Sequence, residues 1–328
     1  MMMKIGLSPL QGQARFDETL DECIRAEEAG FDSVWLGEHH NNPILHPAPL
    51  IGLAAIASRT SRVGLGTGVL LLPLYHPMMV AEEGAMVDMI SGGRLILGVG
   101  VGYAPEEFAA FGESLKQRGT RMDESAELVL RLWTEENVTH EGRHFKVSNA
   151  TVAPRPIQSP RPPMWFGAWA DPAIRRAARL GDAWVVGPSA SLGEIKPSLS
   201  TYRDACESAG KGGGNVALFR YVFVGDTTKD AIDTAGDAFI NAFENMYFRW
   251  PHPVVSRPQG DLTIDRLAQD RIIFGDPQTC IEEIRRFRNE LNVTHLVCRL
   301  SVPGIPRAAC ARSLELFTRE VMPALRAD

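Results

Sequence analysis

Three ionisable side chains stand in a row at the end of a short apolar run: Glu38, His39 and His40. The run before them, 34–36, is typical of a strand buried on both faces, and Gly30 ends the helix that precedes it. Parallel strands of α/β proteins carry their chemistry at their carboxyl ends. Histidine titrates near neutral pH, and a nearby carboxylate fixes its tautomer or raises its pKa, so the triplet is suited to proton transfer.

Two other interpretations of the triplet stay open. In one it is a satisfied polar cluster at the mouth of a barrel, and in the other Glu38 and the histidines bind the metal of a hydrolase. The metal interpretation is weakened because the segment has neither a His-x-His nor a His-Glu-x-x-His spacing. Adjacent histidines on a strand also point to opposite sides. We therefore favour acid/base chemistry and expect no metal.

Two glycine-rich segments accompany predicted strands, Gly-Leu-Gly-Thr-Gly at 64–68 and Gly-Val-Gly-Val-Gly at 98–102. Neither has the Gly-x-Gly-x-x-Gly spacing that opens a helix after a first strand, so no nicotinamide-dinucleotide fingerprint is present. Glycine in a strand lets the backbone pass close to a flat or bulky group. That group is either a neighbouring helix or a cofactor ring.

The elements that position these residues alternate between strand and helix along the chain. Their short connections predict parallel strands with right-handed crossovers, and eight such strands favour a (β/α)8 TIM barrel with insertions over an open sheet. We expect one domain, 1–328, with an insertion of little helix at 137–163 and a long loop at 248–275. The predicted strands are 4–8, 34–36, 62–72, 94–100, 164–168, 183–186, 216–224 and 294–299.

Aromatic residues of the second half are candidates for the lining of an apolar pocket. Each of them, taken alone, is more typical of a core than of a ligand contact. They are Trp165, Phe166, Trp169, Trp184, Tyr247, Phe248 and Trp250.

The composition is that of an ordinary globular protein, with 45% hydrophobic and 23% charged residues among 328. A net charge of −6 without any Lys/Arg-rich run argues against nucleic acid and anionic membranes as partners. Five scattered cysteines without a Cys-x-x-Cys pair argue against a disulfide framework and a zinc site. We see no signal peptide and no membrane span, so the expected location is the cytoplasm.

Four segments taken together resemble the bacterial luciferase-like monooxygenases. The resemblance covers nearly the whole chain, and its motifs are specific as a set although each is short. It implies a (β/α)8 barrel with an insertion. The segments are Gly-Glu-His-His (37–40), Gly-Thr-Gly-Val-Leu-Leu-Leu-Pro-Leu-Tyr-His-Pro (66–77), Ser-Gly-Gly-Arg-Leu-Ile-Leu-Gly-Val-Gly-Val-Gly (91–102) and Arg-Ala-Ala-Arg-Leu-Gly-Asp-Ala-Trp (176–184), with Gly-Asp-Pro (275–277) and Val-Met-Pro-Ala-Leu (321–325) in agreement.

The resemblance implies a two-component flavin-dependent monooxygenase. In that family reduced FMN (FMNH2) lies across the carboxyl ends of the strands and is supplied by a separate NAD(P)H-dependent flavin reductase. With O2 it oxidises a small apolar substrate such as an aldehyde, a ketone or a hydrocarbon. The chain has no second cofactor fingerprint with which to reduce flavin itself. A homodimer through the helices after the second and third strands is implied as well.

The resemblance also implies roles for individual residues. His39 matches the catalytic base beside the flavin, His40 matches its neighbour, and Glu38 completes the catalytic triplet. The Gly68–Val69 bond matches a non-prolyl cis peptide against which the flavin ring packs. The remaining cofactor-binding positions are Gly100, Val101, Gly167, Ala168, Trp169 and Ala170.

This chain departs from the family pattern where the flavin phosphate binds. Val101 replaces an arginine, and the helix start at 168–173 has Asp171 and no Ser or Thr. Gly100 replaces the reactive cysteine of the luciferases, so we do not expect light emission. The phosphate would then depend on backbone N–H groups of that helix or on another cation, and the candidates are Arg155, Arg161 and Arg175.

These departures leave two alternatives open. One is an F420-dependent oxidoreductase on the same barrel, in which His39 assists hydride transfer. The other is a non-catalytic flavin-binding protein, which is disfavoured because storage requires tight binding. The triplet looks more like the FMN branch, because F420 members more often have Asp-His at that position.

Overall fold

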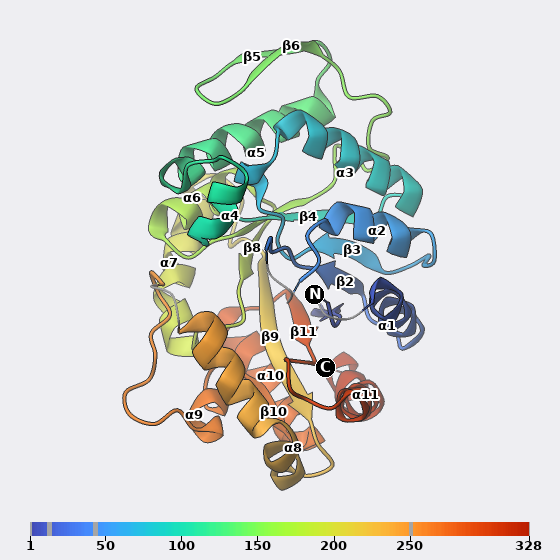
Figure 1. Cartoon of the computed structure of the whole chain (residues 1–328), viewed down its shortest axis with the longest axis vertical. Helices are drawn as coiled ribbons and strands as arrows, with labels where there is room; N and C mark the ends of the chain where they lie inside the picture. Colours follow the sequence, from blue (N-terminus) through green and yellow to red (C-terminus); the bar gives the residue numbers. More distant parts are fainter. Residues whose placement is uncertain (1, 12–14, 42–44, 249–251, 328) are drawn as a thin grey trace.

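A computed structural model describes residues 2–11, 15–41, 45–248 and 252–327 and shows a closed ring of eight parallel strands surrounded by helices (Figure 1). The ring closes where the last strand pairs with the first, Leu296 lying opposite Ile5. The predicted (β/α)8 barrel is confirmed. In order around the ring the strands are β1 (Lys4–Ser8), β2 (Ser33–Leu36), β3 (Gly64–Thr67), β4 (Leu95–Val99), β7 (Met164–Gly167), β8 (Ala183–Val186), β9 (Val216–Val224) and β11 (His295–Arg299).

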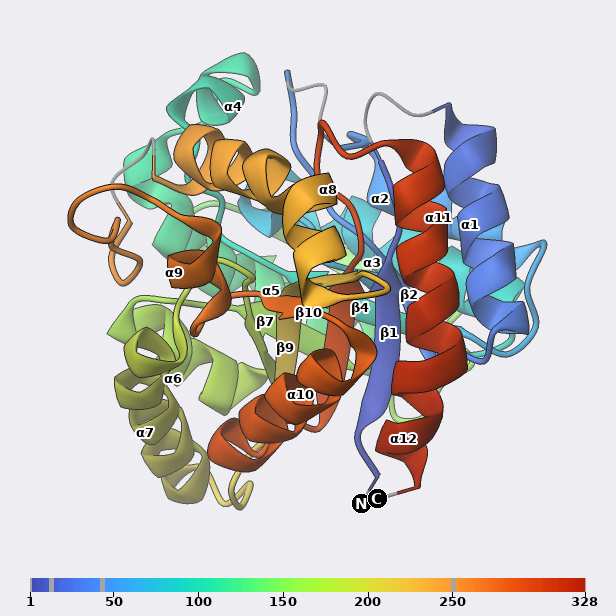
Figure 2. The ribbon, with the colours of Figure 1, turned by 90° about the horizontal axis from the view of Figure 1, so that it is seen from below.

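Helices connect successive strands and cover the outside of the barrel. Figure 2 shows the first and last of the long helices, α1 and α11, side by side. Apolar side chains between strands and helices form one continuous outer core. The helices are α1 (Phe16–Glu28), α2 (Pro49–Ala57), α3 (Pro77–Ser91), α4 (Pro105–Ala110), α5 (Arg118–Thr134), α6 (Asp171–Leu180), α7 (Leu192–Ser208), α8 (Thr228–Ala242), α9 (Ile264–Ala268), α10 (Pro277–Leu291), α11 (Arg307–Leu316) and α12 (Met322–Arg326).

The barrel interior is packed with aromatic and branched side chains. Trp35 of β2 stacks on Trp165 of β7 with ring centroids 5.0 Å apart, and it meets Phe219 of β9 edge-on at 5.6 Å. Val185 and Val297 complete this inner cluster. The interior is therefore a solid core, and the space for a ligand lies at the barrel mouth.

The third strand is shorter than the predicted 62–72. It ends at Thr67, and the chain then passes through a cis peptide bond at Gly68–Val69 into a single 3₁₀ turn, Leu72–Leu74. Pro73 in this turn has no N–H for a strand ladder, which is why the apolar run does not continue as a strand. Its leucines are buried beside the barrel mouth.

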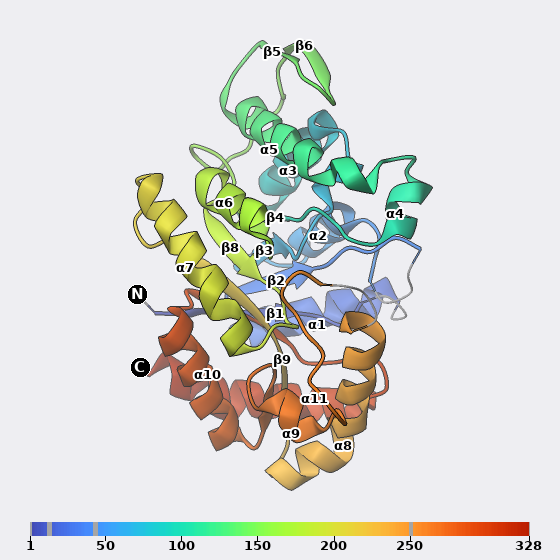
Figure 3. The same ribbon diagram turned by 90° about the vertical axis from the view of Figure 1, so that its left-hand side faces the viewer.

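The segment 137–163 contains an antiparallel hairpin of β5 (Val138–Glu141) and β6 (Lys146–Ala150). Figure 3 shows the hairpin beyond α5, at the end of the molecule opposite α8 and α9. After the hairpin in the chain, the backbone N–H groups of Ile157 and Gln158 donate hydrogen bonds to the buried carboxylate of Asp88 on α3, at 2.7 and 2.9 Å. These bonds fasten the proline-rich return of the chain to the barrel.

The segment predicted as a long loop, 248–275, is interrupted by α9 and by a short strand, β10 (Ile273–Gly275). The strand pairs in parallel with the far end of β9, Ile273 lying opposite Val222. A strand of three residues leaves too little period-two pattern to be found from sequence. Trp250 lies outside the described residues. In the described part of the chain, no helix has the length and apolar content that crossing a membrane requires.

Candidate active site at the barrel mouth

His39 is held by a carboxylate that follows the fourth barrel strand. Its Nδ1 lies 2.8 Å from Oε1 of Glu107, whose side chain is almost wholly buried. The same oxygen accepts the backbone N–H of His40 at 2.8 Å, so it acts as an acceptor and Nδ1 carries the proton. Nε2 of His39 is then the basic nitrogen, and it faces the hydroxyl of Tyr103 at 3.3 Å.

The charge of Glu107 is maintained in this buried place. Burial raises the pKa of Glu107, but hydrogen bonds from His39 and from the backbone of His40 outweigh burial, and the pKa of the carboxyl lies below its usual value. Oε2 of Glu107 is buried and has no hydrogen-bond partner in the structure. Partial desolvation of its hydroxyl and the charge of Glu107 raise the pKa of Tyr103 to about 12, so this phenol stays neutral.

Glu38 and His40 form a second pair that faces away from His39. Nε2 of His40 lies 2.9 Å from Oε1 of Glu38, which has no exposed side-chain surface. Glu38 also accepts the backbone N–H of Leu71 at 2.5 Å and the hydroxyl of Tyr75. All its bonds go to the protein, so Glu38 fastens the segment after β3 to the segment after β2. The hydrogen bond that His40 donates to Glu38 is the main reason that the pKa of His40 is raised.

A flat apolar wall lies beside these pairs, at the ends of β3, β4 and β7. A Cβ on Gly100 would lie 2.5 Å from Cγ2 of Val69, and one on Gly167 would lie 3.3 Å from Cγ1 of the same side chain. A Cβ on Gly68 would lie 2.8 Å from the Phe219 ring. Gly100 and Gly167 therefore let Val69 occupy its place, and Gly68 leaves room for the Phe219 ring. The structure brings together Gly68, Val69, Gly100 and Gly167, and it contains the cis peptide that the resemblance implies.

The region where the flavin phosphate is expected to bind has few features that attract an anion. Ala168 is buried, Trp169 packs edge-on against His252 with centroids 5.2 Å apart, and Ala170 precedes α6 without a side-chain cap. Asp171 is the exposed first residue of that helix. Its carboxylate opposes a phosphate, whereas the helix dipole favours one.

Two of the three arginines expected to bind the flavin phosphate form ion pairs away from the phosphate region. Arg161 precedes β7 at the opposite end of the barrel and pairs with Asp182 at 2.7 Å. Arg155 pairs with Glu136 at 3.2 Å, next to the hairpin. The prediction that they serve the phosphate is wrong, because sequence proximity to β7 did not show on which end they lie. Arg175 is exposed on the second turn of α6.

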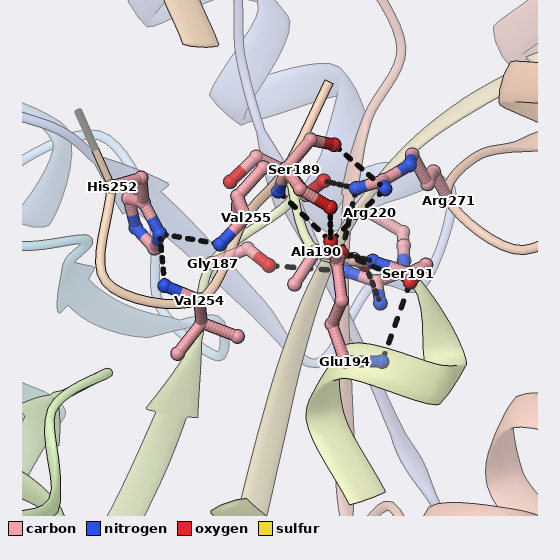
Figure 4. Close-up of polar contacts among 11 residues, drawn as sticks. Gly187, Ser189, Ala190, Ser191, Glu194, Arg220, His252, Val254, Val255 and Arg271 are labelled. Atoms are coloured by element: carbon pink, nitrogen blue, oxygen red, sulfur yellow. Dashed lines mark hydrogen bonds and ion pairs between the residues drawn. The ribbon is translucent and has the colours of Figure 1, made fainter. Parts of the chain in front are cut away.

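A dense polar cluster fixes the loops on the far side of the mouth (Figure 4). Arg271 donates to both carboxylate oxygens of Glu194, at 2.8 and 3.2 Å, and to the carbonyls of Ser189 and Ser256. Glu194 in turn caps α7 through Ser191. Burial raises the pKa of Glu194, but these hydrogen bonds outweigh it and lower the pKa to about 2. Every group of Glu194 and Arg271 is used by the fold.

The predicted aromatic pocket is only partly formed. Trp184 and Phe166 are buried in the core, and Trp184 donates to the carbonyl of Ala168 at 2.9 Å. Trp165 lies inside the barrel. The hydroxyl of Tyr247 is 2.9 Å from that of Tyr221. Sequence reasoning missed Tyr103, Glu107 and Tyr221. The signal for Glu107 was an acidic residue just inside a short helix that directly follows a glycine-rich strand end.

The two histidines do not converge on a metal. His39 bonds to Glu107 and His40 to Glu38, on different sides of the chain. Within the described ranges, no three His, Cys, Asp or Glu side chains are grouped in a way that would hold a metal ion.

Comparison with known proteins adds four findings. The family model described as luciferase-like monooxygenase matches residues 1–295. The chain is 33% identical over 327 residues to an F420-dependent glucose-6-phosphate dehydrogenase of Nakamurella multipartita, covering 94% of this chain and 93% of that protein. It is 32% identical over 241 residues to the oxygenase component of a flavin-dependent trigonelline monooxygenase of Acinetobacter baylyi, covering 72% and 66%. The solved structure of monooxygenase RslO1 from Streptomyces bottropensis has a TM-score of 0.86 at 30% identity, covering 98% and 99% of the two chains.

Proposed function

The chain belongs to the luciferase-like monooxygenase family, and from this premise we propose that it is the oxygenase component of a two-component flavin-dependent monooxygenase. It takes reduced FMN from a separate NAD(P)H-dependent flavin reductase and uses O2 to oxidise a small substrate at the barrel mouth. The observation that carries the proposal is the His39–Glu107 pair. It lies at the end of β2, next to the Gly68–Val69 bond at the end of the neighbouring strand β3.

The wall at the barrel mouth fits the ring of a flavin. Val69 presents a branched apolar side chain, and Gly100 and Gly167 keep the space around it free of Cβ atoms. The region expected to bind the flavin phosphate has little to attract an anion, because Val101, Ala168 and Ala170 carry no charge. Loose binding suits a reduced flavin that diffuses in from another protein. When bound, reduced FMN supplies the electrons that activate O2.

The protein's own contribution is a positioned base in a partly enclosed site. Glu107 accepts a hydrogen bond from Nδ1–H of His39, so the opposite nitrogen, Nε2, points a lone pair toward the mouth. Nε2 then accepts a proton from the substrate or from water, and the nearby carboxylate stabilises the resulting imidazolium. Tyr103 donates to Nε2 and, being about half exposed, can give way to a substrate.

An F420-dependent oxidoreductase is the second candidate, and one observation favours it. A relative that matches 94% of this chain at 33% identity is F420-dependent. In this alternative His39 would serve the proton transfer that accompanies hydride transfer.

A single set of titrations separates the candidates. The protein is titrated anaerobically with oxidised FMN, photoreduced FMN and F420, followed by fluorescence or absorbance. Preferential binding of reduced FMN, and O2 consumption coupled to oxidation of an added substrate, is the expected result. Binding of F420 alone would establish the second candidate. Flavin binding without oxidation of any of the aldehydes, ketones and carboxylate-bearing compounds supplied would indicate a non-catalytic flavin-binding protein.

His39→Ala provides the control for these titrations. Because the imidazole is a base and not part of the Val69 wall, the variant should bind reduced FMN like the wild type and lose oxidation. Loss of flavin binding in this variant would contradict the assigned role.

We also propose that the protein forms a homodimer through α2 and α3. These neighbouring helices expose large apolar side chains, which is unusual for the surface of a monomer. The expected result of light scattering is a dimer that Ile51→Glu converts to a monomer. The side chains are Ile51, Met79, Met86, Met89 and Ile90, from 38% to 71% exposed.

A further inference from the structure

Arg299, the last residue of β11, is a partly buried cation at the barrel mouth with only neutral partners. Its Nε lies 3.4 Å from Oγ of Ser8, and its Nη1 lies 3.5 Å from the hydroxyl of Tyr221. Both distances are at the long limit of a hydrogen bond. In the part of the chain that the structure describes, Arg299 takes part in no ion pair, and its other neighbour, the phenol of Tyr247, is neutral as well.

Two other buried arginines of this chain meet a carboxylate, whereas Arg220 donates only to backbone carbonyls and its Nε has no partner among the described residues. Arg176 meets the carboxylate of Asp123 at 2.6 and 2.9 Å, and Arg271 meets Glu194 at 2.8 Å. A guanidinium cannot discharge itself by losing a proton, and removing it from water without a counter-charge is costly. Arg299 is therefore left with donors and charge that an incoming group can satisfy.

The guanidinium lines a cavity of the size that small molecules occupy. The cavity measures about 810 Å³, within the usual range for ligand sites. Its lining includes the hydroxyls of Ser8 and Tyr221 and three apolar side chains, which are Leu45, Met246 and Leu300. Charged side chains of both signs from α1 and α11 also line it, among them Glu18, Glu22 and Arg25. A ligand that fits these walls has an apolar body and one polar or charged end.

The same cation lies next to the segment that carries the catalytic histidine. Nη2 of Arg299 is 3.4 Å from the point where a Cβ on Gly37 would sit, and the carbonyl oxygen of Gly68 is 3.3 Å from that point. Gly37 directly precedes Glu38 and is two residues from His39. A molecule anchored on Arg299 is thereby held at the end of β2 and β3, where the proposed chemistry takes place.

We propose that Arg299, with the hydroxyls of Ser8 and Tyr221, is an anion subsite that binds a carboxylate on the substrate. The planar fork of a guanidinium matches a carboxylate with two parallel hydrogen bonds, and the Tyr221 hydroxyl, braced by Tyr247 at 2.9 Å, adds a third donor. The substrate is thus a carboxylate with an apolar body, in place of the wholly apolar molecule that the family resemblance implies. That the bound molecule is the substrate rests on the proposed function.

The test measures binding to the flavin-free protein, so that it does not depend on turnover. Three matched pairs are titrated calorimetrically: benzoate and benzamide, nicotinate and nicotinamide, octanoate and octanamide. For at least one pair the carboxylate should bind about tenfold or more tightly than the amide, as expected for a charge-assisted bidentate contact. Equal binding within every pair, or no binding by any carboxylate, would overturn the proposal.

Variants assign the preference to Arg299. Arg299→Met should bring the carboxylate-to-amide ratio close to one, and Arg299→Lys should restore part of it because the charge returns without the fork. Arg307→Met is the matched control, since this arginine lies on the outer rim of the same cavity, is 69% exposed and pairs with Glu18; its ratio should stay at the wild-type value. An Arg299→Met variant that keeps the ratio overturns the proposal.

A flavin titration of the same variants separates the subsite from the cofactor site. Arg299→Met should bind reduced FMN, or F420, with wild-type affinity. If that affinity falls by the same factor as the carboxylate preference, Arg299 belongs to the cofactor site and the anion subsite is disproved. If carboxylates bind through Arg299 but neither cofactor binds, the subsite stands and the proposed function fails.

Discussion

Nδ1 of His39 and Oε1 of Glu107 meet at 2.8 Å although 68 residues separate them in the chain. The two side chains come from the ends of different barrel strands, β2 and β4, and neither would have a defined orientation without the other. The pair fixes which nitrogen of His39 is basic. Glu107 touches no reacting atom in this arrangement, so it is a positioning residue for the proposed base.

Glu107→Gln should lower kcat by about 10–100-fold, the usual effect of removing the group that orients a catalytic ligand or base. The neutral amide no longer stabilises an imidazolium and no longer enforces one tautomer. Substrate and flavin affinities should change little, because Glu107 is nearly buried beneath His39. The measurement is steady-state oxidation with reduced FMN, resolved into kcat and KM.

Glu106→Gln is the matched control for this change, since the neighbouring glutamate on α4 is exposed. It should leave kcat within about twofold of the wild type, as surface substitutions do. Equal losses in both variants would show that the effect comes from α4 as a whole and not from the bond to His39.

The protonation of His40 provides a second prediction. Its hydrogen bond to Glu38 raises its pKa above the ordinary value of 6.5, against the lowering effect of burial. Burial lowers the pKa of His295 inside the barrel to about 3 and also lowers that of His252. In an NMR titration the His40 ring should therefore titrate above 6.5 and His252 below it, while His295 stays neutral at physiological pH. His40→Asn identifies the signal by its disappearance.

The raised pKa of His40 determines whether its contribution to the free energy of unfolding grows or shrinks as the pH rises. A histidine whose pKa is higher in the folded state adds stability below its unfolded pKa and loses it as the pH rises through the folded value. The free energy of unfolding lost in His40→Asn should thus be larger at pH 6 than at pH 9. His252→Asn should show the opposite trend, because burial lowers the pKa of His252.

The barrel itself could be predicted because its signals are local. Each strand is a short apolar run that ends in glycine or a polar residue, and several helices begin or end at Pro or Gly, among them α2, α3 and α10. The triplet 38–40 was found for the same reason, since it directly follows such a run. The apolar run after Thr67 misled the prediction of β3, because a strand and a buried irregular segment have the same composition.

The partners of the site could not be predicted from local patterns. Glu107 and Arg299 reach the mouth only because β2, β4 and β11 end at the same edge of the barrel, and no spacing in the sequence encodes that meeting. Arg155 and Arg161 show the converse. Both are close in sequence to β7, yet they pair with Glu136 and Asp182 away from the mouth.

Gly100→Ala tests the wall that is proposed to receive the flavin ring. The new Cβ would stand 2.5 Å from Cγ2 of Val69, so Val69 or the backbone must move. Overpacking of this kind costs about 1–3 kcal/mol of stability, and reduced FMN should bind about tenfold more weakly. Adding Val69→Ala should restore the stability, because the clashing methyl group is removed.

Gly193→Ala is the control for Gly100→Ala. Gly193 lies in the first turn of α7, where a Cβ would meet nothing within 4 Å. The change should leave flavin binding at the wild-type value and raise stability slightly, since alanine favours a helix. Wild-type flavin affinity in Gly100→Ala would show that the ring does not pack on Val69.

The cluster around Glu194 should make the free energy of unfolding depend on pH over a defined acidic range. Hydrogen bonds from Arg271 and from Ser191 and Ser256 outweigh burial and lower the pKa of Glu194 to about 2, from an ordinary value of 4.5. A carboxyl whose pKa is depressed on folding adds stability above its unfolded pKa and loses it as the pH falls through the folded value. Glu194→Gln should therefore cost about 1–3 kcal/mol at pH 7, as loss of a buried charged hydrogen-bond partner does. The difference in free energy of unfolding between this variant and the wild type should become smaller as the pH falls from 4.5 to 2.

Urea unfolding of both proteins at pH 7, 4 and 3 measures this gap. Glu244→Gln serves as the comparison, because Glu244 also pairs with an arginine, Arg257 at 2.6 Å, but on the surface. Exposed pairs contribute little, so this variant should stay near the wild type at every pH. A gap for Glu194→Gln that is the same at pH 7 and pH 3 would show that the side chain stabilises the loops by its shape alone. The charge of Glu194 would then have no part in joining the β8–α7 loop to the segment around Ser256.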